Sequence, residues 1–225
     1  RLIAWGADPA ATVVTGNLKF DAVSRSAWTV ESARSPRTLT SLLQAQRPIV
    51  VAGCVTDLDE QHTILDAFVE LRATHRNALL VVAPRHPEVT ERMVALRGFL
   101  EQRALRSLFR SQAPDEPLHD GVSCLVLDTI GDLRDFYAAA TVAHVGVDHN
   151  VLEPLAFDKP VTVLEGWEAT YPSYPVYQLL REQGALLDAH DASTLAARWV
   201  AVLSGGSERD RHQLHVRDVL TRASG

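Results

Sequence analysis

The chain has 225 residues, of which 46% are hydrophobic and 22% charged, and its formal net charge is −6 at pH 7. This composition excludes collagen, a disulfide scaffold, a coiled coil and wholesale disorder, and the longest apolar stretches are too short for a membrane span. The acidic balance argues against nucleic acid as a partner, because a duplex-binding protein presents a basic face.

Short apolar runs alternate along the chain with segments of helical periodicity. The predicted strands are 12–15, 48–52, 78–83, 122–127, 142–147, 160–164 and 185–187. The predicted helices are 57–74, 87–102, 132–140, 174–183, 192–203 and 207–222. Two stretches, 21–36 and 111–120, are predicted loops. The alternation indicates βαβ units, and we expect one α/β domain with a Rossmann-like, doubly wound, mostly parallel sheet.

The two cysteines, Cys54 and Cys124, adjoin strand-like apolar residues. In a chain of this length they are interpreted as reduced core residues and not as a bridge, which favours a cytosolic location. His212 and His215 lie three residues apart, but no third ligand has suitable spacing, so no metal site is predicted.

Arg85 follows the predicted strand 78–83 and precedes a helix that Pro87 can begin. Ligands of open parallel sheets bind beyond the carboxyl ends of the strands. A guanidinium at that edge suits a phosphate or a carboxylate, and a surface arginine at the sheet edge is the alternative.

The segment 128–131 follows the next strand. Asp128 or Thr129 can cap the helix after it. Free N–H groups at such a helix start could also bind an anion or the polar edge of a base.

The densest polar cluster, 148–156, follows the strand 142–147. Asn150 can cap a helix whose first turn holds Glu153. Glu153 is then either the acid of a capping box or an acceptor for a ribose diol. His149 could donate to a phosphate or a sugar, or could be structural.

Four motifs in this order resemble a known family. They are V-T-G-N-L-K-F-D at 14–21, V-A-P-R-H-P-E at 82–88, L-D-T-I-G-D-L at 127–133, and H-N-V-L-E-P-L-A at 149–156 with K-P-V at 159–161. The chain resembles the 3-deoxy-D-manno-octulosonic acid (Kdo) transferases of lipopolysaccharide synthesis over nearly its whole length.

This resemblance implies a GT-B glycosyltransferase, in which two Rossmann-like domains flank a cleft. Residues 1–225 would be the C-terminal donor domain, and the N-terminal acceptor domain with its general base would be absent from this chain. The donor would be CMP-Kdo and the acceptor a lipid A precursor, at the cytoplasmic side of the bacterial inner membrane. The reaction would displace CMP directly, with inversion and without a cofactor or metal, and the isolated chain is expected to be inactive.

The resemblance also implies roles for individual residues. Arg85 would contact the CMP phosphate or the Kdo carboxylate. Ile130 and Gly131 would approach the cytosine. Asn150, with His149 beside it, would face the phosphate, and Glu153 would hold the ribose. Asn17 and Lys19, in the first motif, would face the interdomain cleft.

Two segments depart from the family pattern. The family's A-G-S-T-H reads A-G-C-V-T at 52–56, and a longer glycine-rich loop is reduced here to Gly146, Val147 and Asp148 before His149. The shorter loop offers fewer N–H donors to a phosphate. Two alternatives therefore stay open: a UDP-sugar GT-B enzyme half, and a noncatalytic Rossmann-like module that has lost its donor loop.

Overall fold

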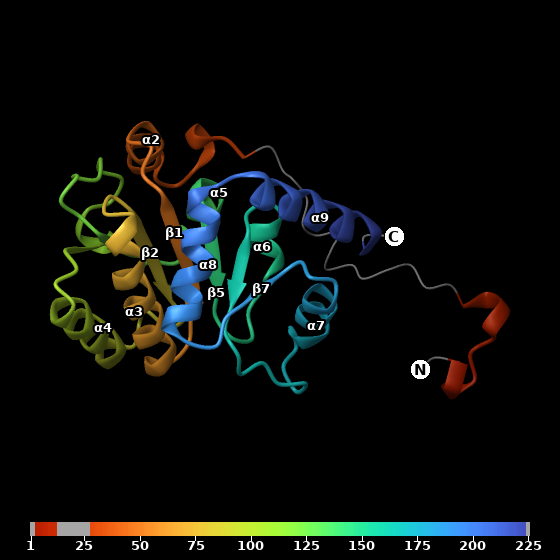
Figure 1. Ribbon diagram of the computed structural model, residues 1–225. Coiled ribbons are helices and arrows are strands. Elements are labelled where there is room, and N and C mark those ends of the chain that lie inside the picture. The colour runs from red at the N-terminus through yellow and green to blue at the C-terminus, as the bar shows by residue number, and fades with distance from the viewer. Residues whose placement is uncertain (1–2, 13–27, 224–225) are drawn as a thin grey trace.

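The computed structural model describes residues 3–12 and 28–223. Within this part the strands form one seven-stranded sheet of order β3-β4-β2-β1-β5-β6-β7, and all neighbouring strands are parallel (Figure 1). The strands are β1 Ile49–Val55, β2 Leu79–Pro84, β3 Ser107–Phe109, β4 Cys124–Val126, β5 Val142–Val145, β6 Val161–Val163 and β7 Leu187–Asp188. The predicted Rossmann-like parallel sheet is confirmed.

Helices cover both faces of this sheet. They are α2 Pro36–Gln44, α3 Leu58–Thr74, α4 Thr90–Gln102, α5 Leu133–Ala139, α6 Leu152–Leu155, α7 Tyr174–Glu182, α8 Ala192–Ser204 and α9 Ser207–Ala223. Single 3₁₀ turns occupy Ile3–Trp5, Pro9–Ala11, Val30–Ser32 and Arg110–Gln112. Within the described ranges, no helix is both long and apolar enough to cross a bilayer.

The alternation of side chains along β1 divides the core in two. Val50 and Ala52 pack with α3, α4 and α8, and α8 lies over this face of the sheet (Figure 1). Ile49 and Val51 pack on the other face, with α2, α5, α6, α7 and α9. Because successive strand residues point to opposite faces, a strand covered on both sides must be apolar throughout. The doubly wound arrangement is therefore confirmed as well.

Helix α3 shows how the sequence pattern becomes packing. Its predicted stripe of Ile64, Leu65, Phe68 and Leu71 is buried, and these residues share a cluster with Trp199 of α8. A stripe spaced three and four residues apart occupies one face of a helix, so a single apolar face directs α3 onto the sheet.

Both cysteines carry free thiols, as predicted. Cys124 is buried in β4, and Cys54 is half-buried at the end of β1. Burial raises the pKa of the Cys54 thiol to about 11.

Several predicted boundaries were wrong. Helix α4 begins at Thr90 and not at Pro87, because the backbone first makes a turn in which Val89 N–H donates to the carbonyl of His86. The three-residue strand β3 was not predicted. The predicted strand 12–15 lies almost wholly outside the described residues.

Helix α2 was also missed, and it begins at Pro36, the last residue of the predicted loop 21–36. Its first turn is capped from elsewhere in the chain: Asp115 Oδ1 accepts from the N–H groups of Arg37 and Thr38, at 2.8 and 3.2 Å. A local sequence pattern does not reveal a cap supplied by a residue almost 80 positions later.

The order of the strands fixes where a ligand site can lie. From β1 the chain passes to β2, which is the neighbour of β1 on one side, and β5 is the neighbour of β1 on the other side. The connections after β1 and β5 therefore diverge, which leaves a crevice beyond the carboxyl ends of these strands.

Candidate functional site

The end of β1 and the turn after β5 touch through their backbones. The N–H of Gly146 donates to the carbonyl of Gly53 at 3.0 Å, and a Cβ at Gly146 would overlap the carbonyl oxygen of Cys54. The register of β1 shifts at Cys54, whose φ of 58° lies in the left-handed region. Only a glycine at 146 allows this approach, so the shortened loop is closely packed.

A buried carboxylate lies beneath these two turns. Glu60, in the first turn of α3, is 6% exposed and accepts from the N–H of Thr56 at 2.7 Å and from that of Val147 at 3.2 Å. Its Oε1 is 3.7 Å from Nε2 of the buried His144. Burial alone would raise the pKa of Glu60, but the imidazole and the two N–H groups lower it below its usual value.

Two cavities open above the turns, and Arg85 and Asp148 line both. One, of about 360 Å³, is also lined by Thr56, Asp57, Asp59, Glu60, Thr63, Val147, Leu164, Glu165, Gly166, Tyr171 and His190. The other, of about 450 Å³, is also lined by His149, Asn150, Val151, Pro172, Ser173 and Val176. The structure thus brings three predicted residues, Arg85, His149 and Asn150, to one cavity.

Arg85 and His149 give this second cavity its chemistry. Arg85 is exposed at the end of β2, and its N–H donates to the carbonyl of Val55 at 3.0 Å. His149 is half-buried, and its Nε2 has no hydrogen-bond partner within the described residues. Burial, followed by the charge of Arg85, lowers the pKa of His149. A guanidinium beside a neutral imidazole can hold a phosphate or a carboxylate.

Asn150 and Glu153 behave differently from the predicted capping box. Asn150 Oδ1 does accept from the N–H of Leu152 at 3.2 Å, at the start of the one-turn helix α6. Glu153, however, accepts from the Asn150 side-chain amide at 3.5 Å and not from its backbone N–H, so no capping box forms. Glu153 lines neither cavity, and desolvation raises the pKa of its carboxyl.

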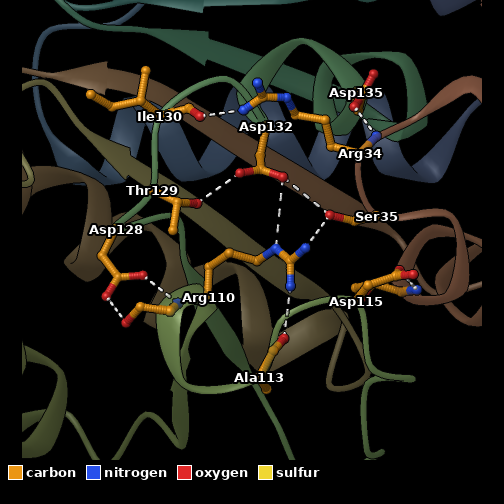
Figure 2. Close-up of polar contacts among 12 residues, drawn as sticks. Arg34, Ser35, Arg110, Ala113, Asp115, Asp128, Thr129, Ile130, Asp132 and Asp135 are labelled. Atoms are coloured by element: carbon orange, nitrogen blue, oxygen red, sulfur yellow. Dashed lines mark hydrogen bonds and ion pairs between the residues drawn. The ribbon is translucent and has the colours of Figure 1, made fainter.

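The turn 128–132 is held by side chains that were predicted to cap a helix. Asp128 instead accepts from the N–H and the hydroxyl of Ser111, and Thr129 Oγ1 donates to Asp132 at 2.7 Å. Helix α5 begins at Leu133 without a side-chain cap. The prediction that Asp128 or Thr129 caps it was wrong, because both side chains have partners outside the helix (Figure 2).

Arg34 is a residue of this region that the sequence analysis missed. Its guanidinium donates to the carbonyl of Ile130 at 2.6 Å, and it fills the space that a Cβ at Gly131 would need (Figure 2). Gly131 has a φ of 99°, and the Ile130 side chain is 80% exposed. Ile130 and Gly131, the predicted base contacts, therefore form an exposed tip that lines neither cavity. The contact with Arg34 could not be predicted from a local sequence pattern, because Arg34 and Ile130 are 96 residues apart.

Beneath this tip lies a buried polar cluster (Figure 2). Arg110 and Asp132 are each 6% exposed and form an ion pair at 3.8 Å. Asp132 also accepts from the hydroxyl of Ser35 at 3.1 Å, while Arg110 donates to that hydroxyl and to the carbonyl of Ala113 at 2.7 Å. This cluster joins the segment before α2 to the turn 128–132.

A second carboxylate extends the same junction. Asp135 of α5 accepts from the indole of Trp28 and from the N–H of Arg34, both at 2.9 Å. Residues 28–35 are thus bonded to the turn and helix that follow β4.

Two of the predicted residues, Asn17 and Lys19, lie outside the described residues. Across residues 3–12 and 28–223, no group of three or more His, Cys, Asp or Glu side chains is placed to hold a metal ion.

Comparison with known proteins agrees with the resemblance carried by the four motifs. No protein-family model matches the chain. The chain is 29% identical over 205 residues to the 3-deoxy-D-manno-octulosonic acid transferase of Haemophilus influenzae, an alignment that covers 88% of this chain and 45% of the relative. It is 32% identical over 174 residues to the protein of the same name from Bordetella pertussis, covering 72% and 37%. The chain therefore spans less than half the length of these relatives.

Solved structures show the same architecture. The C-terminal CMP-Kdo binding domain of WaaA from Acinetobacter baumannii superposes with a TM-score of 0.72 at 22% identity, covering 85% of this chain and 97% of that domain. An α,α-trehalose 6-phosphate synthase from Burkholderia multivorans gives 0.65 at 17% identity, covering 91% and 45%. At these identities the likeness concerns the fold, which is that of one GT-B domain.

Proposed function

We propose that this chain, which corresponds to the C-terminal half of a Kdo transferase, binds the CMP-Kdo donor. The complete enzyme would transfer Kdo to a lipid A precursor in lipopolysaccharide synthesis. We place this reaction at the cytoplasmic side of the bacterial inner membrane. CMP-Kdo is the substrate in this proposal, and no cofactor or metal is required.

The observation that carries the proposal is the convergence of Arg85, His149 and Asn150 on one cavity of about 450 Å³ at the crevice between β1 and β5. The three residues come from two of the family motifs, which lie more than 60 positions apart. CMP-Kdo carries a phosphate and a carboxylate, and a guanidinium binds either through paired N–H donors. We assign Arg85 to these anions, with His149 and Asn150 as polar contacts beside it.

The remaining assignments concern the nucleoside. We assign Glu153 to the ribose hydroxyls, because among the described residues its carboxylate accepts only the weak 3.5 Å hydrogen bond from Asn150 and keeps acceptor capacity. Ile130 and Gly131 would contact the cytosine at the exposed tip that Arg34 supports.

In the reaction itself, an acceptor hydroxyl oxygen would attack the anomeric carbon of Kdo. The bond from that carbon to the phosphate oxygen breaks, and CMP leaves with the electron pair. The hydroxyl proton passes to a general base in the other half of the enzyme. Transfer needs both walls of the cleft to align the reactants and exclude water, so this chain alone is expected to transfer nothing.

Calorimetric titration of the chain with CMP, CDP, UMP and UDP at equal concentrations tests the proposal. We expect weak binding with a preference for CMP. A preference for UDP would instead indicate a GT-B enzyme that uses a UDP-sugar. If neither this chain nor the full-length protein binds any of the four nucleotides, the proposal is refuted and the noncatalytic module is favoured.

A further inference from the structure

Glu60 connects the two turns that border the crevice. Its two carboxylate oxygens accept from backbone N–H groups on different connections, Thr56 after β1 and Val147 after β5. Since the side chain is 6% exposed, water has little access to replace either bond. A group with two acceptors and no donor is required there, because both partners are donors.

The backbone around Glu60 requires such support. Cys54 at the end of β1 and Asp148 in the turn after β5 adopt left-handed φ values of 58° and 63°, which are uncommon for residues other than glycine. Asp148 is tied to Ser173 by a hydrogen bond of 2.6 Å, and it immediately precedes His149. A loop in this conformation persists only where its surroundings fix it.

A buried histidine lies behind the carboxylate, on the core side. His144 of β5 is 0% exposed, and its Nδ1 lies 3.3 Å from Thr162 Oγ1. That hydroxyl donates to the carbonyl of Ala143 and accepts from the indole of Trp199, so it is fixed beside the imidazole. The imidazole Nε2 lies 3.7 Å from Glu60 Oε1, so the fixed ring forms the wall behind the carboxylate.

We infer that Glu60 is a positioning residue of the donor site: it holds residues 147–150 against the β1–α3 turn, so that His149 and Asn150 face the same cavity as Arg85. The bonds from Glu60 take the place of the longer glycine-rich loop implied by the family resemblance. This inference rests on the proposed function, because its effect is on donor binding.

The test uses Glu60→Gln, which keeps the shape of the side chain but turns an amide NH₂ toward one of the two N–H groups. We expect amide exchange of residues 146–150, measured by mass spectrometry without ligand, to become at least about tenfold faster. We expect the Kd for CMP to rise by a similar factor. Removing a negative charge near a phosphate should by itself strengthen binding, so weaker binding reports lost geometry.

Asp191→Ala is the matched control. Asp191 caps the N-terminus of α8, which packs on α3, by accepting from Thr194 N–H at 2.8 Å. Its loss should lower the unfolding temperature while leaving both exchange in 146–150 and CMP affinity unchanged. If Glu60→Gln does not fold, Glu60→Asp retains the charge but is one methylene too short to reach both turns, and the same results are expected.

The outcomes separate the two hypotheses. If the unaltered chain binds CMP and Glu60→Gln binds it equally well, the positioning role is overturned, whatever the change in stability. Unchanged exchange in 146–150 overturns it as well, and this measurement needs no ligand. If neither the unaltered chain nor the full-length protein binds CMP, the proposed function itself has failed, and the role of Glu60 in donor binding fails with it.

Discussion

Replacement of Asp132 by alanine tests the buried cluster under the turn 128–132. The carboxylate accepts hydrogen bonds from Thr129 and Ser35 and pairs with Arg110. Asp132→Ala removes all three interactions at once. The guanidinium then stays buried, with the Ser35 hydroxyl and the carbonyl of Ala113 as its remaining partners.

The size of the effect follows from burial. Removing one partner of a buried ion pair destabilises a protein by about 3–5 kcal/mol, because the other charge is left uncompensated. Arg110 retains two neutral acceptors, so we expect the lower end, about 3 kcal/mol. For a domain of this size about 2–4 °C of unfolding temperature correspond to 1 kcal/mol, which gives a decrease of roughly 6–12 °C.

Urea denaturation followed by tryptophan fluorescence measures this free energy. Asp218→Ala is the control, because Asp218 pairs with Arg222 at 2.8 Å on the surface, where an ion pair contributes only about 0–1 kcal/mol. The double variant Arg110→Met with Asp132→Ala should cost less than the sum of the two single variants. A loss for Asp132→Ala below about 1 kcal/mol, or no larger than that of the control, would refute the reasoning.

Three further predictions concern the site itself. Glu153→Ala should weaken CMP binding in calorimetry and change the free energy of unfolding by less than about 0.5 kcal/mol; a stability loss of roughly 0.5–2 kcal/mol with unchanged affinity would make Glu153 only a cap. Because burial and Arg85 lower the pKa of His149 in the folded state, the unfolded chain takes up its proton first. The stability from the neutral imidazole is therefore complete above about pH 6.5 and declines as the pH falls below it, and urea midpoints between pH 5 and 7 should become less pH-dependent in His149→Gln. Gly146→Ala should destabilise the chain by about 1–3 kcal/mol, since its Cβ would overlap the Cys54 carbonyl, and an unchanged urea midpoint would contradict the close packing of the two turns.

Most of the fold was predictable because the core is patterned locally. Strands covered on both faces are apolar throughout, as in β1 and β2, and the stripe on α3 points to one face. The errors occur where long-range contacts decide. Helix α2 depends on Asp115, and β3 is a three-residue strand fixed by its pairing with β4.

The site was predictable in part for a topological reason. Parallel strands end at the same edge, so residues that follow β2 and β5 had to lie close together, and Arg85, His149 and Asn150 do. Glu60 was missed because an acidic residue in the first turn of a helix looks like an ordinary exposed one. Arg34 was missed because its contact with Ile130 joins residues far apart in sequence.

The bonds from residues 28–38 to residues 113–135 have a consequence for the order of folding. The first residues of α2 and the segment before it depend on acceptors that are synthesised about 80 to 100 residues later. Leu39 and Leu42, which are buried in the core, can therefore reach their native packing only after residues 113–135 have been synthesised. Contacts of such sequence separation form slowly, because a long loop must first close. The native burial of this apolar helix face is therefore a late step that depends on the chain segment 113–135.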